Sequence, residues 1–211
     1  MTMRSFSKKK LAIIGAGGHG KVCAYVASNI NNQLQGGNIW SEIVFIDDHK
    51  TGSVNGFKII SKDVNFIPEN YEVFVAIGDN KARKELMNHY ESLGFIIATL
   101  KDPHGIIADN TLIGKGTVVM PGAVISPNAV IGNGVIINTS SIIEHDCKIS
   151  DYAHISPGAV LAGGVSIGEC TWIGANSTIL QKKIICNNVI IGAGATVTKD
   201  IDKHGIYKGF I

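Results

Sequence analysis

The sequence has few charged residues, no paired cysteine spacing and no long hydrophobic run. Of its 211 residues, 17% are charged and 45% are hydrophobic, and the formal net charge is only +2. A charge balance this close to zero gives no reason to expect a nucleic acid or an anionic membrane as a partner. The cysteines do not follow the short spacings of zinc sites or disulfide frameworks; they are Cys23, Cys147, Cys170 and Cys186.

No hydrophobic run approaches the length that spans a membrane. The polar, basic start of the chain leads into an apolar segment at residues 11–14, which is too short for the apolar region of a signal peptide. We therefore expect a cytoplasmic protein without a membrane span.

What the sequence does contain is a six-residue repeat through its second half. Every sixth position carries a bulky aliphatic residue: Ile107, Ile113, Val119, Ile125, Ile131, Ile137, Ile143, Ile149, Ile155, Leu161, Ile167, Ile173, Ile179, Ile185, Ile191 and Val197. Four positions after each lies a small or modest residue, with Lys183 as the exception. A fixed short period indicates a stacked architecture. Three hexads make one triangular coil of short parallel strands with the aliphatic residues inside, and the pattern resembles the left-handed β-helix of hexapeptide-repeat acyltransferases.

The first part of the chain alternates predicted strands and helices. We expect strands at residues 11–14, 43–46, 73–77 and 95–100, and helices at 21–30 and 81–93, the second capped by Asp79. Such alternation favours a small parallel α/β sheet, large enough for one nucleotide-binding half but not for a full dinucleotide fold. The sequence therefore predicts a Rossmann-like half domain at residues 1–103 and a β-helix domain at residues 104–211.

A glycine-rich turn lies between the first strand and the first helix. Gly15, Gly17 and Gly20 match the dinucleotide fingerprint, in which backbone N–H groups and a helix N-terminus face a phosphate. Glycines also permit a tight turn without any ligand, but the strand–turn–helix context favours ligand binding. Asp47 and Asp48 end the second strand, where they can grip a ribose or a base. His19 is unusual in a dinucleotide site, so NAD is the less favoured ligand.

His145 is the repeat residue that best fits catalytic chemistry. It lies at a prism corner, two positions after an inward aliphatic, and is flanked by Glu144 and Asp146. A carboxylate beside an imidazole raises its basicity and fixes its tautomer. Because one coil is three hexads long, Gly163 should stack on His145, where its N–H can stabilise an oxyanion. Acyl transfer from a thioester needs such a base and such a donor, which favours catalysis over a merely solvated histidine.

His154 has two open interpretations. It immediately precedes the inward Ile155, so it either contacts an acyl donor or covers a strand. A zinc site like that of trimeric β-helix carbonic anhydrases is disfavoured, because His145 and His154 have the wrong spacing and no third coil histidine follows. We expect no metal.

Taken in order, these motifs carry a family resemblance. They are GAGGHG at residues 15–20, FIDD at 45–48, AIGDN at 76–80 with Arg83, NTSSIIEHDC at 138–147 and YAHISPGAVLAG at 152–163. The chain resembles the sialic-acid O-acetyltransferase family, and within it the nucleotide-sugar N-acetyltransferases that make UDP-bacillosamine-type amino sugars. The resemblance spans residues 10–209, although Phe210 stands where the family commonly has proline. It implies an acetyl-CoA-dependent homotrimer with each active site between neighbouring β-helices.

The resemblance also implies roles for individual residues. In the β-helix, His145 matches the general base, Asp146 its acidic support and Gly163 the amide at the thioester oxygen. Contacts to acetyl-CoA match His154, Gly163, Ala175 and Ala193. Contacts to the nucleotide sugar match Gly17, Gly18, His19, Asp47, Asp48, Gly78, Asn80 and Arg83, with Asp47 and Asp48 at the uridine.

The predicted function is therefore transfer of an acetyl group to the 4-amino group of a UDP-linked amino-deoxy sugar, for bacterial glycan biosynthesis. One alternative keeps the fold and changes the acceptor to a hydroxyl of sialic acid or another sugar. A non-catalytic nucleotide-sugar-binding scaffold is a second alternative, against which the His–Asp pair and its overlying glycine argue. A nicotinamide-binding protein is a third.

Overall fold

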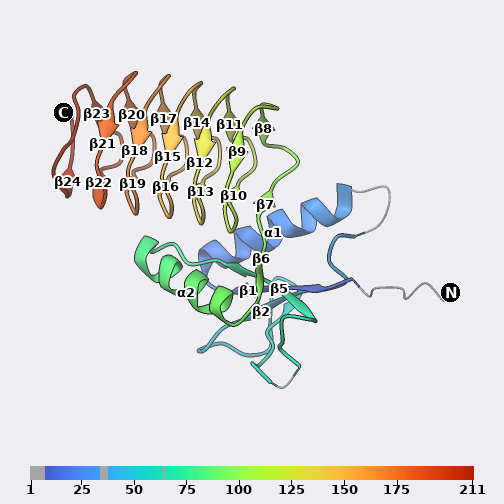
Figure 1. The fold of residues 1–211 in the computed structure, drawn as a ribbon. Helices are drawn as coiled ribbons and strands as arrows, with labels where there is room; N and C mark the ends of the chain where they lie inside the picture. The colour runs from blue at the N-terminus through green and yellow to red at the C-terminus, as the bar shows by residue number, and fades with distance from the viewer. Residues whose placement is uncertain (1–7, 34–37, 64) are drawn as a thin grey trace.

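The computed structural model describes residues 8–33, 38–63 and 65–211 (Figure 1). A small α/β region lies beneath a triangular prism of stacked coils. Residues 1–7, on which the expectation about a signal peptide partly rests, lie outside the described residues. Within the described ranges, no helix is both long and apolar enough to cross a membrane.

The α/β region is a four-stranded parallel sheet with two helices. The strand order is β2–β1–β5–β6, from β1 (Lys10–Ile14), β2 (Ile43–Ile46), β5 (Tyr71–Val75) and β6 (Ile96–Ile97). A short antiparallel pair, β3 (Ser53–Val54) and β4 (Phe57–Lys58), follows β2. The strands are mostly apolar, with Lys10 and Glu72 as charged exceptions, because both faces of the sheet are covered. Alternate residues of β1 pack with α1 (Gly18–Gln33) or with α2 (Asn80–Ser92).

One of the two helices begins at an aspartate cap and the other at the glycine-rich turn. Asp79 caps α2 as predicted, since its Oδ1 accepts a hydrogen bond from the N–H of Ala82 at 2.8 Å. Helix α1 begins at Gly18, inside the glycine-rich turn and earlier than the sequence predicted, because the N–H of Lys21 already bonds to the carbonyl of Gly17. The first N–H groups of α1 therefore belong to the glycine-rich turn itself.

The prism has three parallel sheets. We call them the docked face, which meets the α/β region, and the apolar and mixed faces, after their outward-facing side chains. The docked face faces the α/β region and has seven strands: β7 (Leu100–Lys101), β10 (Val118–Val119), β13 (Ile136–Ile137), β16 (His154–Ile155), β19 (Trp172–Ile173), β22 (Val189–Ile191) and β24 (Gly205–Tyr207). The apolar face has six: β8 (Ile106–Ile107), β11 (Val124–Ile125), β14 (Ile142–Ile143), β17 (Val160–Leu161), β20 (Thr178–Ile179) and β23 (Thr196–Val197). The mixed face has five: β9 (Leu112–Ile113), β12 (Val130–Ile131), β15 (Lys148–Ile149), β18 (Ser166–Ile167) and β21 (Ile184–Ile185).

The hexad pattern explains this packing. The second residue of each two-residue strand points inward, and Ile125, Ile143 and Ile155 are at most 1% exposed. Each strand pairs in parallel with the strand one coil away, for example Ile143 with Ile125 and with Leu161. The predicted architecture, an α/β region followed by a left-handed parallel β-helix of hexapeptide repeats, is confirmed.

Most corners of the prism turn through a residue in the left-handed region. At each sixth position from Gly116 to Gly194 the φ angle lies between 53° and 72°. Glycine, asparagine and aspartate tolerate this conformation best, and they hold most of these positions. Asn128 and Asp146 are two of them, so their side chains occupy equivalent places in successive coils.

The two regions meet earlier in the chain than the predicted boundary at residue 104. The predicted strand at 95–100 is two strands: β6 joins the α/β sheet, whereas β7 pairs with β10 in the docked face. Leu100 and Val118 share one buried cluster with Ala24 and Ala27 of α1. The first strands of the docked face therefore form part of the surface on which α1 packs.

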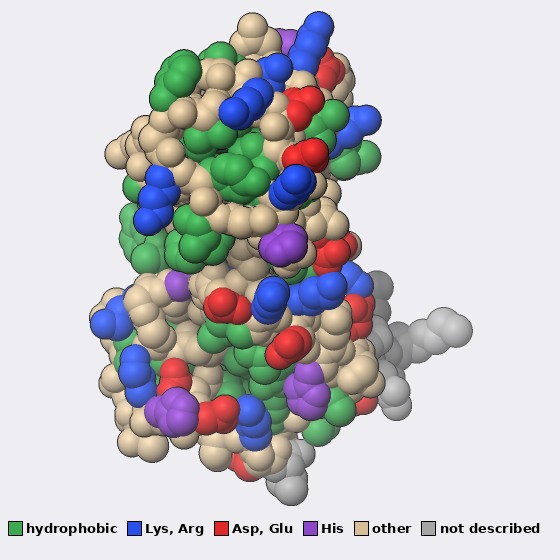
Figure 2. Space-filling model, turned by 90° about the vertical axis from the view of Figure 1, so that its left-hand side faces the viewer, with side chains coloured by type: hydrophobic (Ala, Val, Ile, Leu, Met, Phe, Trp, Pro, Cys, Tyr) green, Lys and Arg blue, Asp and Glu red, His purple; other side chains and the backbone are tan. Residues whose placement is uncertain are grey.

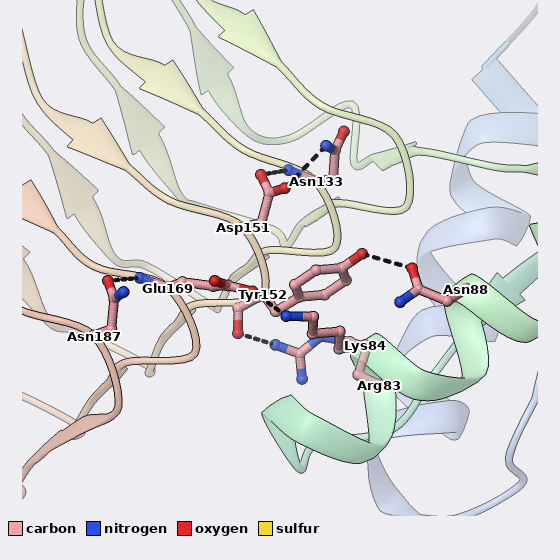
Figure 3. Close-up of polar contacts among 8 residues, drawn as sticks. All are labelled: Arg83, Lys84, Asn88, Asn133, Asp151, Tyr152, Glu169 and Asn187. Atoms are coloured by element: carbon pink, nitrogen blue, oxygen red, sulfur yellow. Dashed lines mark hydrogen bonds and ion pairs between the residues drawn. The ribbon is translucent and has the colours of Figure 1, made fainter. Parts of the chain in front are cut away.

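Helix α2 is fastened to the prism by a buried arginine (Figure 3). Arg83 is 1% exposed, and its guanidinium donates to the carbonyls of Gly134 at 2.7 Å and Tyr152 at 2.8 Å. An exposed ion pair between Lys84 and Glu169 lies beside it. Seen from the side in Figure 2, the prism forms the upper part and the α/β region the lower part, with charges of both signs interspersed over that face.

Candidate active site

His145 and Asp146 form a hydrogen-bonded pair at the corner between the apolar and mixed faces. They make the turn between β14 and β15, and Nδ1 of His145 lies 2.8 Å from Oδ2 of Asp146. The hydrogen bond from His145, followed by one from Asn128, holds the pKa of Asp146 below its ordinary value. An ionised carboxylate only accepts hydrogen bonds, so Nδ1 of His145 carries the proton and Nε2 is left as the basic nitrogen.

Gly163 lies directly against that basic nitrogen. A Cβ added to Gly163 would lie 2.6 Å from Nε2 and 2.7 Å from Cε1 of His145, so any larger residue would push the ring out of its present position. Among the described residues, the N–H of Gly163 has no hydrogen-bond acceptor, whereas the neighbouring N–H of Gly164 bonds to the carbonyl of His145. The structure thus brings a base and an available backbone donor together at an exposed corner.

His154 lies on the docked face rather than at this corner. It is 9% exposed and its ring stacks on Trp172 with centroids 5.4 Å apart, while Nε2 lies 3.1 Å from Nδ2 of Asn138. Burial, then the positive charge of Arg83, lowers the pKa of His154 to about 3, so the ring is neutral at neutral pH. Its Nδ1 is buried and has no protein partner within the described part of the chain.

Ala175 and Ala193 stack at the corner between the docked and apolar faces. The N–H of Gly194 donates to the carbonyl of Ala175 at 2.8 Å, which links the two successive turns. This corner and the His145 corner border the same apolar face from opposite edges.

The glycine-rich turn divides into packing glycines and open glycines. A Cβ at Gly20 would lie 2.0 Å from the carbonyl oxygen of Gly15, so Gly20 is required for the turn to meet the helix. A Cβ added at Gly17 or Gly18 would meet nothing within 4 Å, so this part of the turn is open to a ligand. His19 is half-buried, and burial lowers its pKa to about 4.

The two aspartates after β2 have different surroundings. Asp47 accepts hydrogen bonds from the N–H of Ala16 at 2.8 Å and of His49 at 3.0 Å, so it braces the glycine-rich turn. Asp48 pairs with Lys62 at 3.1 Å and is largely exposed. Both line a cavity of about 210 Å³ whose other lining residues include Gly15, Lys62, Ile77 and Tyr90.

The remaining predicted substrate contacts come from the loop after β5 and from the first turn of α2. Gly78 is open, since a Cβ added there would meet nothing within 4 Å. The guanidinium of Arg83, by contrast, uses all three nitrogens on protein acceptors, which include the carbonyl of Gly78 at 3.1 Å and Oδ1 of Asn80 at 2.7 Å. Asn80 donates in turn to the carbonyl of Cys170 at 3.0 Å. In this structure Arg83 and Asn80 thus bind the prism and the Gly78 loop, and neither presents a free group to a diphosphate.

Comparisons with known proteins agree with these two regions. Residues 10–90 match the family model described as PglD N-terminal domain, and residues 104–139, 128–163 and 164–199 match bacterial transferase hexapeptide repeats. The chain is 34% identical over 186 residues to GDP-perosamine N-acetyltransferase of Escherichia coli O157:H7, which covers 86% of this chain and 82% of that protein. The chain belongs to the hexapeptide-repeat sugar N-acetyltransferases.

Two solved structures extend this similarity over nearly the whole chain. The acetyltransferase domain of PglB from Neisseria gonorrhoeae FA1090, in complex with acetyl coenzyme A, has a TM-score of 0.89 and 38% identity, covering 96% of this chain and 97% of that one. PerB from Caulobacter crescentus, in complex with CoA and GDP-perosamine, has a TM-score of 0.84 and 29% identity, covering 95% and 94%. The predicted family, the bacillosamine-type N-acetyltransferases, is confirmed.

Three residues of this N-acetyltransferase were missed by sequence reasoning. Lys62 pairs with Asp48, Asn138 bonds to His154 and Asn128 donates to Asp146 at 3.2 Å. Two of them had a readable signal: Asn110, Asn128 and Asp146 recur at the coil spacing, and Asn138 opens the motif at residues 138–147, although neither Asn128 nor Asn138 was given a role. No group of three His, Cys, Asp or Glu side chains in the described ranges is arranged to hold a metal ion.

Proposed function

We propose that this N-acetyltransferase transfers the acetyl group of acetyl-CoA to the 4-amino group of a UDP-linked amino-deoxy sugar, in the cytoplasmic synthesis of bacterial glycans. The observation that carries the proposal is the free Nε2 of His145 facing Gly163, with Nδ1 held by Asp146 at 2.8 Å. A neutral imidazole with its tautomer fixed in this way can accept a proton at Nε2 and so act as a general base.

The chemistry is direct transfer through a ternary complex. The sugar amine attacks the thioester carbonyl carbon, and Nε2 of His145 takes the proton that the amine loses. The carbonyl oxygen becomes an oxyanion that accepts a hydrogen bond from the N–H of Gly163. The carbon–sulfur bond then breaks, and the sulfur of CoA leaves as a thiolate that takes the proton from His145. No cysteine or serine is needed to carry the acetyl group.

The position of the dyad supports a site shared between copies of the chain. His145 lies at one edge of the apolar face, whereas the nucleotide-binding turn packs behind the docked face. The apolar face presents a column of β-branched side chains, Ile106, Val124, Ile142 and Val160, that no described element of the chain covers. In a homotrimer packed through this face, the His145 corner of one copy meets the Ala175 and Ala193 corner of the next.

The cavity after β2 supports recognition of a base edge that has an N–H beside a carbonyl. The Asp48 carboxylate accepts from the N–H, and the Lys62 ammonium donates to the carbonyl. Uracil and guanine both have such an edge. GDP-linked sugars are therefore the second candidate substrates. The observation that supports them is that two similar proteins are named for, or bound to, GDP-perosamine.

The test is a thiol-release assay with acetyl-CoA and matched acceptors. The acceptors are UDP- and GDP-linked 4-amino sugars together with their 4-hydroxy counterparts. The proposal predicts turnover with the UDP-linked amine and little with the hydroxyl sugars. Turnover of the GDP-linked amine alone moves the assignment to the second candidate. Transfer to hydroxyls only, or no binding of acetyl-CoA, contradicts the proposal.

Complementation tests the sharing of the site. His145→Ala removes the base, and Gly18→Glu places a negative charge in the phosphate turn. Co-expressed mixed trimers should regain activity that neither variant has alone, because some sites then combine an intact base with an intact turn. Absence of recovery in verified mixed trimers contradicts a shared site.

A further inference from the structure

A ladder of side-chain amides runs up the corner of the prism and ends on Asp146. Nδ2 of Asn110 donates to Oδ1 of Asn128 at 3.3 Å, and Nδ2 of Asn128 donates to Oδ1 of Asp146 at 3.2 Å. The other oxygen of Asp146, Oδ2, is the one that pairs with His145 at 2.8 Å. Each carboxylate oxygen thus has its own partner, and the carboxylate cannot rotate without losing one of them.

The direction of the ladder is fixed by the carboxylate at its end. Because an ionised Asp146 only accepts hydrogen bonds, Asn128 turns its NH2 toward Asp146, and its Oδ1 is then left to accept from Asn110. A donor aimed at a carboxylate stabilises the ionised form. Asn128 therefore supports the form of Asp146 that keeps the proton of His145 on Nδ1.

A second ladder, at the corner between the mixed and docked faces, shows what such side chains do elsewhere (Figure 3). There Oδ1 of Asp151 accepts from the backbone N–H of Asn133 at 2.8 Å, and Oδ1 of Asn187 accepts from the backbone N–H of Glu169 at 2.8 Å. These contacts satisfy backbone donors of successive coils. The side-chain bonds of Asn110 and Asn128 are to other side chains alone, so the ladder at the His145 corner does not serve this purpose.

We propose that Asn128, steadied by Asn110, is a positioning residue that orients Asp146 and through it the imidazole of His145. The proposal rests on the proposed function for its effect on catalysis, but the geometry it describes does not. The competing explanation is local: Asn128 has a φ of 63°, and asparagine tolerates that conformation. Glycine tolerates it better, which separates the two explanations.

The first experiment replaces Asn128 with glycine. Asn128→Gly keeps the turn, as glycine does at Gly116, Gly134 and Gly164, and removes only the amide. Asn188→Gly is the matched control, because Asn188 holds the same turn position with a φ of 57° at another corner. We expect Asn128→Gly to lower kcat by about 3- to 10-fold, the range for losing one exposed hydrogen bond to a charged group, with KM and the thermal midpoint unchanged. Asn188→Gly should leave kcat unchanged.

The second experiment changes charge at constant shape. Asn128→Asp places a carboxylate beside Asp146, and Asn133→Asp does the same beside Asp151, where Nδ2 of Asn133 lies 3.2 Å from Oδ2. Besides Asp146, the charged residues of this corner are Glu144, whose Oε2 lies 3.3 Å from the N–H of His145, and Lys182, whose N–H donates to the carbonyl of Gly163 at 2.9 Å. Both are present in the wild type and in the variant, so the difference between the two reports the charge at residue 128. Asn128→Asp should raise the NMR titration midpoint of His145 and the acid limb of kcat/KM by about 0.5 pH unit. Asn133→Asp should change neither.

The outcomes are decisive in both directions. Wild-type kcat in Asn128→Gly, or an equal loss in Asn188→Gly, overturns the positioning role. An unchanged His145 titration in Asn128→Asp overturns the contact itself. If the wild-type enzyme proves inactive toward every nucleotide sugar, the proposed function fails, and the NMR titration still decides whether the ladder acts on the dyad.

Discussion

Replacing Gly163 by alanine tests the geometry of the site with one methyl group. The added Cβ would lie 2.6 Å from Nε2 of His145, about 1 Å closer than atoms in ordinary contact. The His145 side chain is 62% exposed and free to swing outward, so the imidazole gives way before the backbone does. Gly163 has no positive φ, so alanine suits its backbone.

The expected magnitude follows from that displacement. Moving a catalytic base by about 1 Å costs on the order of 100-fold in rate, which corresponds to about 2.7 kcal/mol of activation free energy. Stability should stay constant or rise by about 0.4–1 kcal/mol, because alanine restricts the unfolded chain. Steady-state kinetics and thermal unfolding of Gly163→Ala measure the two effects separately.

Gly168→Ala is the matched control, since its added Cβ would lie 2.5 Å from the backbone N of Asn187 and would strain the coil instead of a side chain. It should lower the thermal midpoint and leave kcat per folded molecule near the wild-type value. The reasoning is refuted if Gly163→Ala keeps kcat within threefold of wild type, or if it loses stability as Gly168→Ala does.

Three further predictions concern stability and assembly. Burial lowers the pKa of His154 to about 3 from its ordinary 6.5. As the pH falls, the unfolded chain therefore takes up a proton before the folded chain does. The free energy of unfolding is unaffected by His154 above about pH 6.5 and falls toward pH 3 at about 1.4 kcal/mol per pH unit. His154→Gln should flatten the slope of unfolding free energy between pH 6 and 4.5 by about one proton, and an unchanged slope contradicts the burial of a neutral ring. Arg83→Met leaves the buried carbonyls of Gly134 and Tyr152 without a donor. It should lower the free energy of unfolding by roughly 3 kcal/mol or more, which is about 6–12 °C in thermal midpoint, whereas Lys84→Met should lower it by under about 1 kcal/mol. Equal losses in the two variants would refute the role of Arg83 in holding α2 on the prism. Ile142→Asp on the apolar face should give inactive monomers in light scattering, while Ser166→Asp on the mixed face should keep the trimer. A trimeric Ile142→Asp would exclude the apolar face as the interface.

The hexad pattern made the prism predictable because one coil fixes which residues stack. That spacing placed Gly163 over His145, and the structure brings the two together with an added Cβ only 2.6 Å from Nε2. It did not separate the strands at residues 96–97 and 100–101, because only Ala98 and Thr99 lie between them, and their partners in different sheets cannot be read from the sequence.

Tertiary contacts decided the residues for which sequence reasoning was insufficient. Arg83 has the same local surroundings whether it faces a diphosphate or solvent, and only the docking of α2 on the prism supplies its carbonyl partners. His154 was open between two interpretations because the stacking of Trp172 depends on the next coil. Asn128 went unnoticed because an asparagine at a left-handed turn needs no further explanation.

The most direct test of the central claim compares two histidine–aspartate pairs in one chain. His104 also pairs with an aspartate, Asp102, with Nδ1 and Oδ1 2.9 Å apart, but it lies before the first strand of the apolar face. The glycine one coil on, Gly122, donates its N–H to the carbonyl of His104, and a Cβ added to it would meet Ser140 and not the His104 ring. We predict that His145→Ala lowers kcat/KM for acetyl transfer by about 10²- to 10⁴-fold in a folded trimer, and that His104→Ala leaves it within threefold of wild type. Wild-type kcat/KM in His145→Ala would contradict the assignment of His145 as the base.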